Sequence, residues 1–404
     1  MGHPAAHPAV ARHRPALSQS HRARPMPLPR LRHFAAEYLL LLPLGAAIAL
    51  VWANLWPESY FRTTLALEFL VNDVAMVAFV GLIMKEVAEA TVPGGVLHPW
   101  RRATLPLVAT LAATLVTALA FWAVVPFFDE PRVREGWPAI LAVDLALGYF
   151  LVRMIFGRHP AVPFFLLIAI GANGLALLAL AATATLTPLR LAVLLGLLAA
   201  TIGVALALRR ARVRSIWPYL LVAGGLSWCA FYFGGFEPAV ALVPIVPFLP
   251  HARRDPGFFV DAAPAARDAL SRFERASRHP AQVALFFFGL VNAGVPVAAL
   301  YSGTWALPLA SLVAKPLGLL LGVGTALLLG LHLPARVGWR EVIVVGFIST
   351  VGFTMALFVA TGALGPGPAL SAVKAGALAS LAGAVLAVAA AAVLRAGRFG
   401  GGRS

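Results

Sequence analysis

From Phe34 onward, long apolar runs alternate with short polar breaks. A helix needs about 20 residues to cross the hydrocarbon core of a bilayer, and no run shows the alternation typical of membrane strands. The eighth run is short and contains Pro238, Pro244, Pro247 and Pro250, so we expect it to be tilted or irregular. The pattern predicts an all-α integral membrane protein with about twelve transmembrane helices, at residues 37–55, 68–90, 103–126, 137–156, 161–184, 189–208, 216–233, 237–250, 281–300, 305–330, 341–362 and 370–395.

The composition supports a membrane protein. Of 404 residues, 60% are hydrophobic and 12% are charged, whereas soluble domains carry roughly 25% charged residues. The net charge of +16 would suggest nucleic-acid binding in a soluble protein. Here the arginines flank apolar runs, which indicates membrane topology and contact with anionic lipids, and no nucleic-acid partner.

We expect three units along the chain. Residues 1–33 hold six arginines, several prolines and no acid, so we predict a disordered basic arm at the cytoplasmic lipid surface. No apolar core follows these arginines before Phe34, which argues against a cleaved signal peptide. Residues 34–395 form the twelve-helix domain, and residues 396–404 form a short tail.

The charges of the loops predict an orientation. Loops after even-numbered spans are basic, as at Arg101 and Arg102, whereas loops after the first, third and seventh spans carry acids such as Glu58, Asp129 and Glu237. Basic loops remain in the cytoplasm. We therefore expect both termini and the loop 251–280 to be cytoplasmic.

An unpaired charge inside a membrane span costs several kcal/mol. The ionisable side chains singled out within the predicted spans are Asp73, Lys85, Glu86, Asp144, Lys315 and Lys374. Asp144 lies near the middle of its span, and two interpretations remain open for it. It neutralises a helix end or a lysine, or it is a titrating carboxylate that binds a cation or a proton. Lys315 precedes Pro316, which weakens the helix, and its ammonium needs an anionic or carbonyl partner.

The other four charges lie near the ends of their spans. Asp73 and Glu86 bracket the second span, within reach of interfacial water. Lys85 is adjacent to Glu86 on another face, and we expect it to be interfacial too. Lys374 opens the last span, where snorkelling of its ammonium to the interface accounts for it.

Small and polar residues mark a break in the eleventh span. Gly346, Gly352 and the pair Ser349–Thr350 interrupt its apolar run. Secondary transporters expose helix ends to ions through such breaks, although close packing of small residues explains the glycines nearly as well. The chain contains no HExxH, GxSxG, P-loop or Rossmann motif, so we do not expect an enzyme.

Ordered motifs across residues 34–395 resemble the NhaA family of sodium/proton antiporters. They are Val51–Asn54, Val71–Met76, Glu86, Arg134–Trp137, Asp144, His279–Pro280, Val291–Val295, Lys315–Gly318 and Val351–Met355. The resemblance implies inverted repeats, with the fourth and eleventh helices broken near Val143, Gly346 and Gly352 and crossing each other. It places Asp144 at the positive ends of the half-helices and Lys315 near their negative ends.

The resemblance also implies a set of functional properties. Glu86, with Asp73 at the other end of its span, would belong to the funnel and the pH response. The transported species would be Na⁺ (or Li⁺) and H⁺, with no cofactor. A multi-pass protein of the bacterial inner membrane is expected, and a homodimer is an expectation as well.

The sequence departs from the family at the ion site, which is a pair of adjacent aspartates in the fifth helix. Alignment from His159–Pro160 places that pair at Ala172 and Asn173, and no acid occurs between Asp144 and Glu237. Val143 also replaces a threonine that the family usually has. Asn173 can offer an oxygen to a cation but cannot titrate.

Two functions therefore remain open. The first is a secondary active transporter of the antiporter type with a degenerate site, in which Asp144 and Asn173 are ligands for sodium or lithium and Lys315 completes the ion and proton site. In this case we predict little electrogenic exchange. The alternative is a transport-inactive homologue that acts as a membrane scaffold, regulator or partner subunit.

Overall fold

The computed structural model describes residues 41–91, 103–128, 130–157, 159–183, 188–250, 269–296 and 302–400, and all regular structure in these ranges is helical. The α-helices are α2 (Leu41–Leu55), α3 (Pro57–Glu68), α4 (Met76–Thr91), α5 (Thr104–Val124), α6 (Trp137–Leu141), α7 (Leu145–Phe156), α8 (Ala161–Thr183), α9 (Pro188–Arg210), α10 (Gly224–Gly234), α11 (Ala269–Asn292), α12 (Ala306–Leu328), α13 (Trp339–Ser349), α14 (Phe353–Ala363), α15 (Pro368–Ala379) and α16 (Ala382–Val393). The basic arm 1–33 lies outside the described residues.

The prediction of an all-helical membrane protein is confirmed. Within the described ranges, six helices are long and apolar enough to cross a membrane, and eight if each bent pair is one span. Shorter apolar helices occupy the first, seventh and eighth predicted positions. The eighth segment consists of two 3₁₀-helices, η7 (Pro238–Leu242) and η8 (Val246–Phe248), as its prolines suggest.

Two predicted boundaries are wrong. The second span is expected to begin at residue 68, but helix starts at Pro57 and continues to Thr91 through α3, the π-helix η2 (Phe69–Ala75) and α4. Pro57 occupies the first turn, where proline is favoured because its missing N–H has no partner there anyway. The ninth span also begins early, since α11 starts at Ala269 and ends at Asn292. Because both helices contain polar side chains, a pattern of apolar runs does not locate these boundaries.

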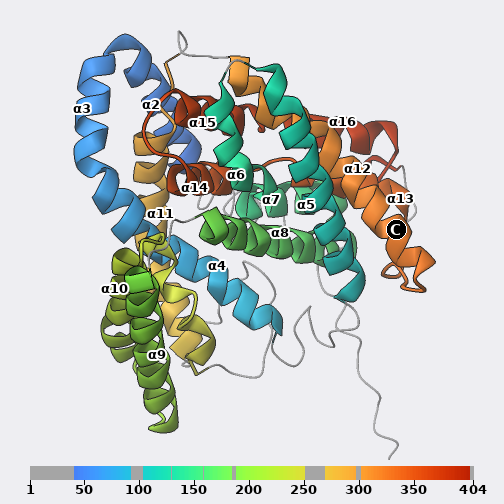
Figure 1. Cartoon of the computed structure of the whole chain (residues 1–404). Helices are drawn as coiled ribbons and strands as arrows, with labels where there is room; N and C mark the ends of the chain where they lie inside the picture. The colour runs from blue at the N-terminus through green and yellow to red at the C-terminus, as the bar shows by residue number, and fades with distance from the viewer. Residues whose placement is uncertain are drawn as a thin grey trace, which may run out of the picture.

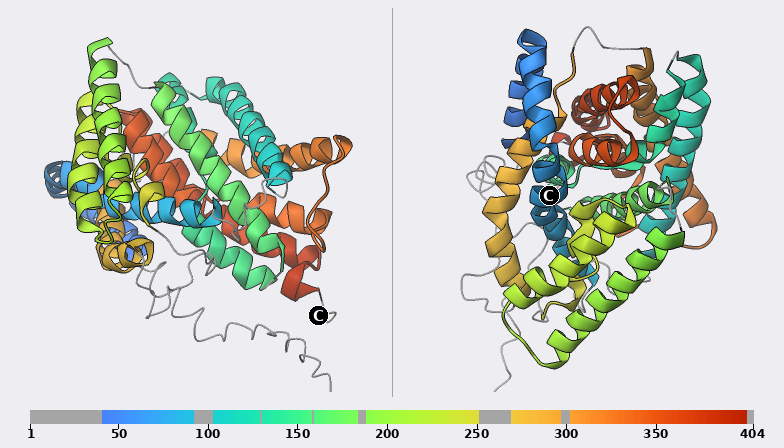
Figure 2. Two further views of the ribbon diagram at one scale, coloured as in Figure 1. Left: turned by 90° about the horizontal axis from the view of Figure 1, so that it is seen from below. Right: turned by 60° about the vertical axis from the view of Figure 1, so that its left-hand side comes forward.

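The two bent helix pairs lie in the interior. Figure 1 shows α6, α7 and α14 among the surrounding helices α5, α8, α12 and α15. The α9–α10 pair stands at one edge of the molecule in both views of Figure 2. Because α8 passes close to both α6 and α14, it is placed to contact the bends themselves.

Helices α5 and α12 pack closely because glycine faces alanine between them. A Cβ atom at Gly318 would lie 2.8 Å from the Cα of Ala113, and one at Gly322 would lie 2.7 Å from the Cα of Ala109. Association of helices in lipid depends on such close van der Waals contact. This contact brings Lys315 of α12 against the interior.

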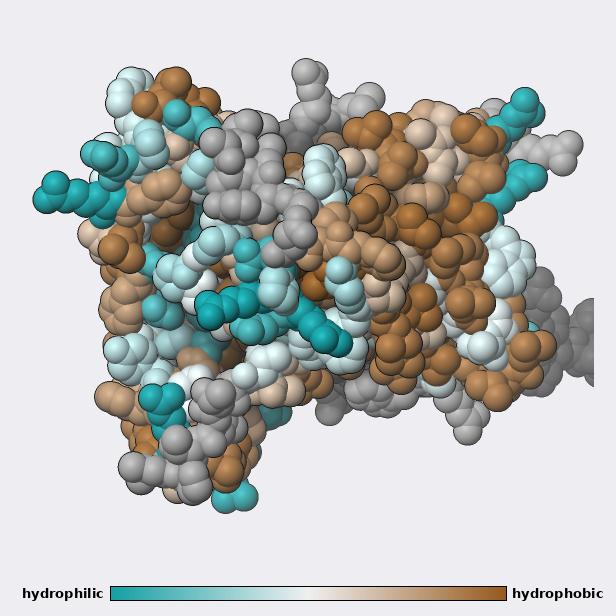
Figure 3. All heavy atoms as spheres, turned by 45° about the horizontal axis from the view of Figure 1, so that its top comes forward, coloured by the Kyte–Doolittle hydropathy of each residue, from teal (hydrophilic) through white to brown (hydrophobic). Residues whose placement is uncertain are grey.

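The outer surface fits a lipid environment. Large apolar side chains are exposed on α5 and α12, as at Leu115 and Leu321. In Figure 3 apolar residues cover most of the right-hand half of the face shown, and hydrophilic side chains gather toward its left and centre. Apolar surface of this extent is stable in contact with acyl chains and not with water.

Candidate functional site

The two broken helices meet at their breaks. The helical segment Pro131–Leu141, which ends with α6, is bent by 53° against α7 around Ala142–Asp144, and α13 is bent by 46° against α14 around Thr350–Gly352. The N–H of Asp144 donates to the C=O of Val351 at 2.7 Å, which joins the two breaks directly. Each break leaves helix-end N–H and C=O groups inside the protein, and these groups need partners.

The carboxylate of Asp144 binds the positive ends of two half-helices. Its side chain is 2% exposed. Its Oδ1 accepts the N–H of Leu147 in the first turn of α7 at 2.9 Å. Its Oδ2 accepts the N–H of Thr354, in the first turn of α14, at 3.0 Å and the hydroxyl of Thr354 at 2.5 Å. A negative carboxylate is stabilised where two helix N-termini point at it.

The ammonium of Lys315 binds the negative end of a half-helix. Its residue is 5% exposed, and its Nζ donates to the C=O of Ala142 at 2.6 Å. Ala142 is the C-cap of α6, where unpaired carbonyls concentrate negative charge. The lysine therefore has the carbonyl partner that its sequence position demands.

Asn173 fills a different part of the crossing. It lies on α8, 3% exposed. Its Oδ1 accepts the N–H of Val143 at 2.9 Å, and its Nδ2 donates to the C=O of Val143 at 2.9 Å. The backbone N–H and C=O of Val143 are thus both satisfied by one side-chain amide. A carboxylate could accept from the N–H but could not donate to the C=O.

Ala172, the other position of the missing acid pair, faces a small cavity. This cavity of about 20 Å³ is lined by Ala172, Val143, Lys315 and Ser349, among others. Its size is that of roughly one water molecule. Ala172 and Lys315 therefore line the same cavity, and the methyl group of Ala172 offers the lysine no charge.

Not every expected residue joins this crossing. Gly352 is the N-cap of α14, and its N–H donates to the hydroxyl of Ser380 at 3.2 Å. Gly346 does not interrupt the helix, because it lies inside α13. A Cβ there would lie 3.0 Å from the Cα of Pro316, so this glycine permits close packing of α13 on α12. Its expected role at the break is wrong.

The second span carries the remaining candidates. Asp73 lies in the π-helix η2, half-buried, and its C=O accepts the indole N–H of Trp228 at 2.8 Å. Glu86 lies on α4, with its side chain outside the described part of the structure. Neither is brought to the crossing by any contact that the structure describes.

The expectation that Lys85 is interfacial is wrong. It is 0% exposed rather than interfacial, and its Nζ lies 3.1 Å from Oε2 of Glu274 on α11. Arg278 lies 3.3 Å from Oε1 of the same carboxylate. The polar face of α11 could have revealed Glu274, but the sequence holds nothing that pairs it with Lys85.

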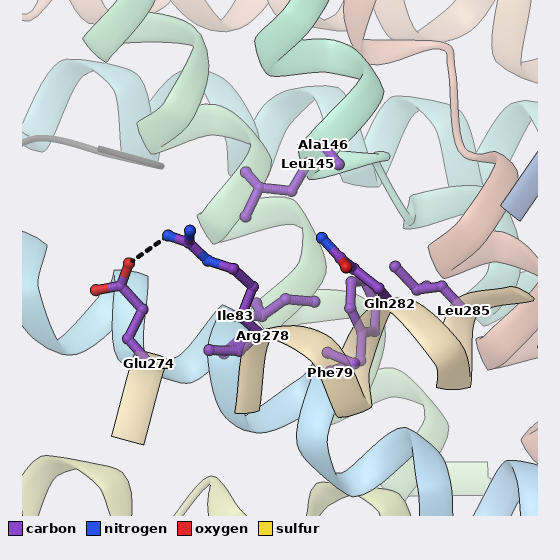
Figure 4. A pocket seen from close by; sticks show the side chains of 10 residues that line it. Phe79, Ile83, Leu145, Ala146, Glu274, Arg278, Gln282 and Leu285 are labelled. Atoms are coloured by element: carbon purple, nitrogen blue, oxygen red, sulfur yellow. Dashed lines mark hydrogen bonds and ion pairs between the residues drawn. The ribbon is translucent and has the colours of Figure 1, made fainter. Parts of the chain in front are cut away.

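The Glu274–Arg278 pair borders a cavity of about 50 Å³ beside the start of α7. In Figure 4 Arg278 turns toward Glu274, and Gln282 of α11 and Leu145 and Ala146, the two residues after Asp144, line the same cavity. The cavity brings polar groups of α11 close to the crossing.

The expectation that Lys374 snorkels to the interface is also wrong. Instead of snorkelling, its Nζ donates to Oδ1 of Asn292 at 3.3 Å. The Nδ2 of Asn292 in turn donates to Oδ1 of Asn72 at 2.7 Å. This chain of polar groups ties α15, α11 and η2 together.

Comparison with known proteins agrees with this geometry. Residues 32–394 match the family model described as Na+/H+ antiporter 1. The chain is 38% identical over 373 residues to "Na(+)/H(+) antiporter NhaA" of Geobacter metallireducens, covering 90% of this chain and 96% of the relative. It is 38% identical over 367 residues to the NhaA antiporter of Desulfitobacterium hafniense, covering 88% and 94%.

A solved structure shares the fold. The sodium proton antiporter MjNhaP1 from Methanocaldococcus jannaschii matches with a TM-score of 0.55 at 14% identity, covering 90% of this chain and 95% of that one. At this identity the match concerns the fold alone. The family match, the identity to curated relatives and the crossing of two broken helices lead to one conclusion: this multi-pass membrane protein belongs to the NhaA family of sodium/proton antiporters.

Proposed function

We propose that the protein is a secondary active transporter of the sodium/proton antiporter type, with an altered ion site that exchanges at most one Na⁺ or Li⁺ for one H⁺. The observation that carries this proposal is the carboxylate of Asp144, held between the first turns of α7 and α14. It is the one acid at the crossing among the described residues. A single carboxylate that binds either a proton or a sodium ion moves equal charge in both directions.

The two positions of the missing acid pair cannot supply a second proton site. Ala172 has no titratable group, and the amide of Asn173 does not ionise near neutral pH. Electrogenic exchange needs more protons than sodium ions in each cycle. We therefore expect the transport to be electroneutral.

The hydrogen bonds also favour an alternative. Both carboxylate oxygens of Asp144 accept N–H groups, and the oxygen of Asn173 accepts the N–H of Val143. Binding of sodium would have to displace some of these donors, because a hard cation needs several oxygen ligands. If the crossing does not open, the protein is a transport-inactive homologue that acts as a scaffold, regulator or partner subunit.

We further propose the setting in which this function operates. The arginines of the loops favour a bacterial inner membrane with anionic lipids and cytoplasmic termini. In this setting the protein forms a homodimer. No cofactor takes part in an exchange that depends only on the binding of ions to side chains.

The test is ion flux in liposomes that contain purified protein and a pH-sensitive dye. We expect a sodium gradient to drive proton movement that a potassium–valinomycin potential does not change, and we expect Asp144→Asn to abolish it. Flux that responds to the potential would contradict the one-for-one stoichiometry.

A restored acid pair separates the two functions. The variant Ala172→Asp with Asn173→Asp places acids at both missing positions. If the wild type is silent and this variant is active, the natural chain is the inactive homologue. Silence of both proteins would also reject transport by the natural chain.

A further inference from the structure

A third cavity lies beside α8. Its volume is about 460 Å³, and it is lined by residues of α4, α8, α10, α14 and the segment around η7. Pockets for small organic ligands have volumes of roughly 300–1,000 Å³. Gly174 of α8 contributes to the space, since a Cβ there would meet nothing within 4 Å. The lining is almost entirely apolar, with Val80, Ile170, Leu177, Phe231 and Met355 among its members.

One charged side chain lines this cavity. Glu237, the N-cap of η7, is the single ionisable group among the lining residues, and its Oε1 is buried without a hydrogen-bond partner in the described structure. Arg190 of α9 lies against Gly235 but does not line the cavity. An ionised carboxylate in apolar surroundings is costly, and a cation beside it offsets that cost.

The wall near Glu237 suits an organic cation. Phe231 and Phe236 both line the cavity, and their ring centroids lie 6.4 Å apart in an edge-to-face arrangement. The faces of aromatic rings attract ammonium groups. A bare sodium ion would lose its hydration here without enough oxygen ligands to replace it, and a lipid acyl chain would leave the carboxylate unpaired.

We propose that this cavity binds a protonated organic amine with an apolar body, whose ammonium group pairs with the carboxylate of Glu237 while its hydrocarbon part fills the space beside Gly174. The site lies beside the crossing, because Asn173 forms part of the wall of the cavity. An occupant therefore contacts the residue that holds the break of the fourth span. The inference does not depend on whether the protein transports sodium.

The test is calorimetric titration of the purified protein in detergent with 4-phenylbutylamine hydrochloride and with the uncharged 4-phenylbutan-1-ol. We expect the amine to bind the wild type at least about tenfold more tightly than the alcohol. Glu237→Gln should remove that difference and leave the alcohol unaffected. The matched control Glu135→Gln, which removes an exposed carboxylate elsewhere, should behave as the wild type.

A second variant locates the site. Gly174→Leu places a side chain in the open space of the cavity and should abolish binding of both compounds. Equal affinity of the amine for the wild type and Glu237→Gln would overturn the proposal, and so would equal binding of amine and alcohol, which marks a site for acyl chains. Unchanged binding by Gly174→Leu would place the ligand elsewhere and also overturn it.

Discussion

Val143 shows what it takes to interrupt a helix inside a membrane. Its N–H and C=O have no partners within a helix, because α6 ends at Leu141 and α7 begins at Leu145. No bulk water reaches such groups in the hydrocarbon region. The amide of Asn173 meets both of them at 2.9 Å. At this position an asparagine stabilises the break in a way that an aspartate cannot, because a carboxylate has no N–H to donate.

This pairing makes Asn173 a measurable contributor to stability. We expect Asn173→Leu, which keeps the volume but removes both hydrogen bonds, to destabilise the fold by about 2–4 kcal/mol, since two buried backbone groups lose their partners. Thermal melting of the purified protein in detergent measures the effect. The exposed control on the same helix, Leu178→Ala, should change the melting temperature far less. Equal shifts for the two variants would contradict the pairing.

The elements were largely predictable because the cost of exposing backbone in lipid forces apolar runs into helices. The polar pair Ser349–Thr350 indicates where the eleventh span breaks, whereas the break of the fourth span near Val143 is implied only by the resemblance to the family. Lys85 was misplaced because its partner, Glu274, lies on a distant helix whose contact no local pattern predicts. Gly346 was misplaced because a glycine that permits close packing and a glycine that breaks a helix look alike in sequence.

The close packing of α5 against α12 leads to a prediction about stability. Gly322→Ala would place a methyl group 2.7 Å from the Cα of Ala109, and we expect it to destabilise the protein by about 1–3 kcal/mol by overpacking. Gly324→Ala is the matched control on the same helix, where the first neighbour is a ring atom of Trp339 at 3.9 Å. The control should be neutral or slightly stabilising. Melting in detergent compares the two, and a control as destabilised as Gly322→Ala would refute the packing explanation.

The whole molecule has an orientation that labelling can establish. With Cys229 replaced by alanine, we expect a cysteine at the exposed Glu58 to react with a membrane-impermeant maleimide added to intact cells. A cysteine at the exposed Ala276 of α11 should react only after the membrane is opened, because basic segments remain in the cytoplasm. Labelling of Ala276→Cys in intact cells would reverse the topology.

The shared carboxylate of Asp144 also bears on how the chain is made. Its partner Thr354 follows it by 210 residues. At a synthesis rate of about 5–20 residues per second, that separation corresponds to roughly 10–40 s. During this interval the first four spans have left the ribosome, yet the N-terminus of α14 that completes the coordination of the carboxylate does not exist. The crossing therefore forms late in biogenesis. The early spans reach their final arrangement only after the eleventh span has entered the membrane.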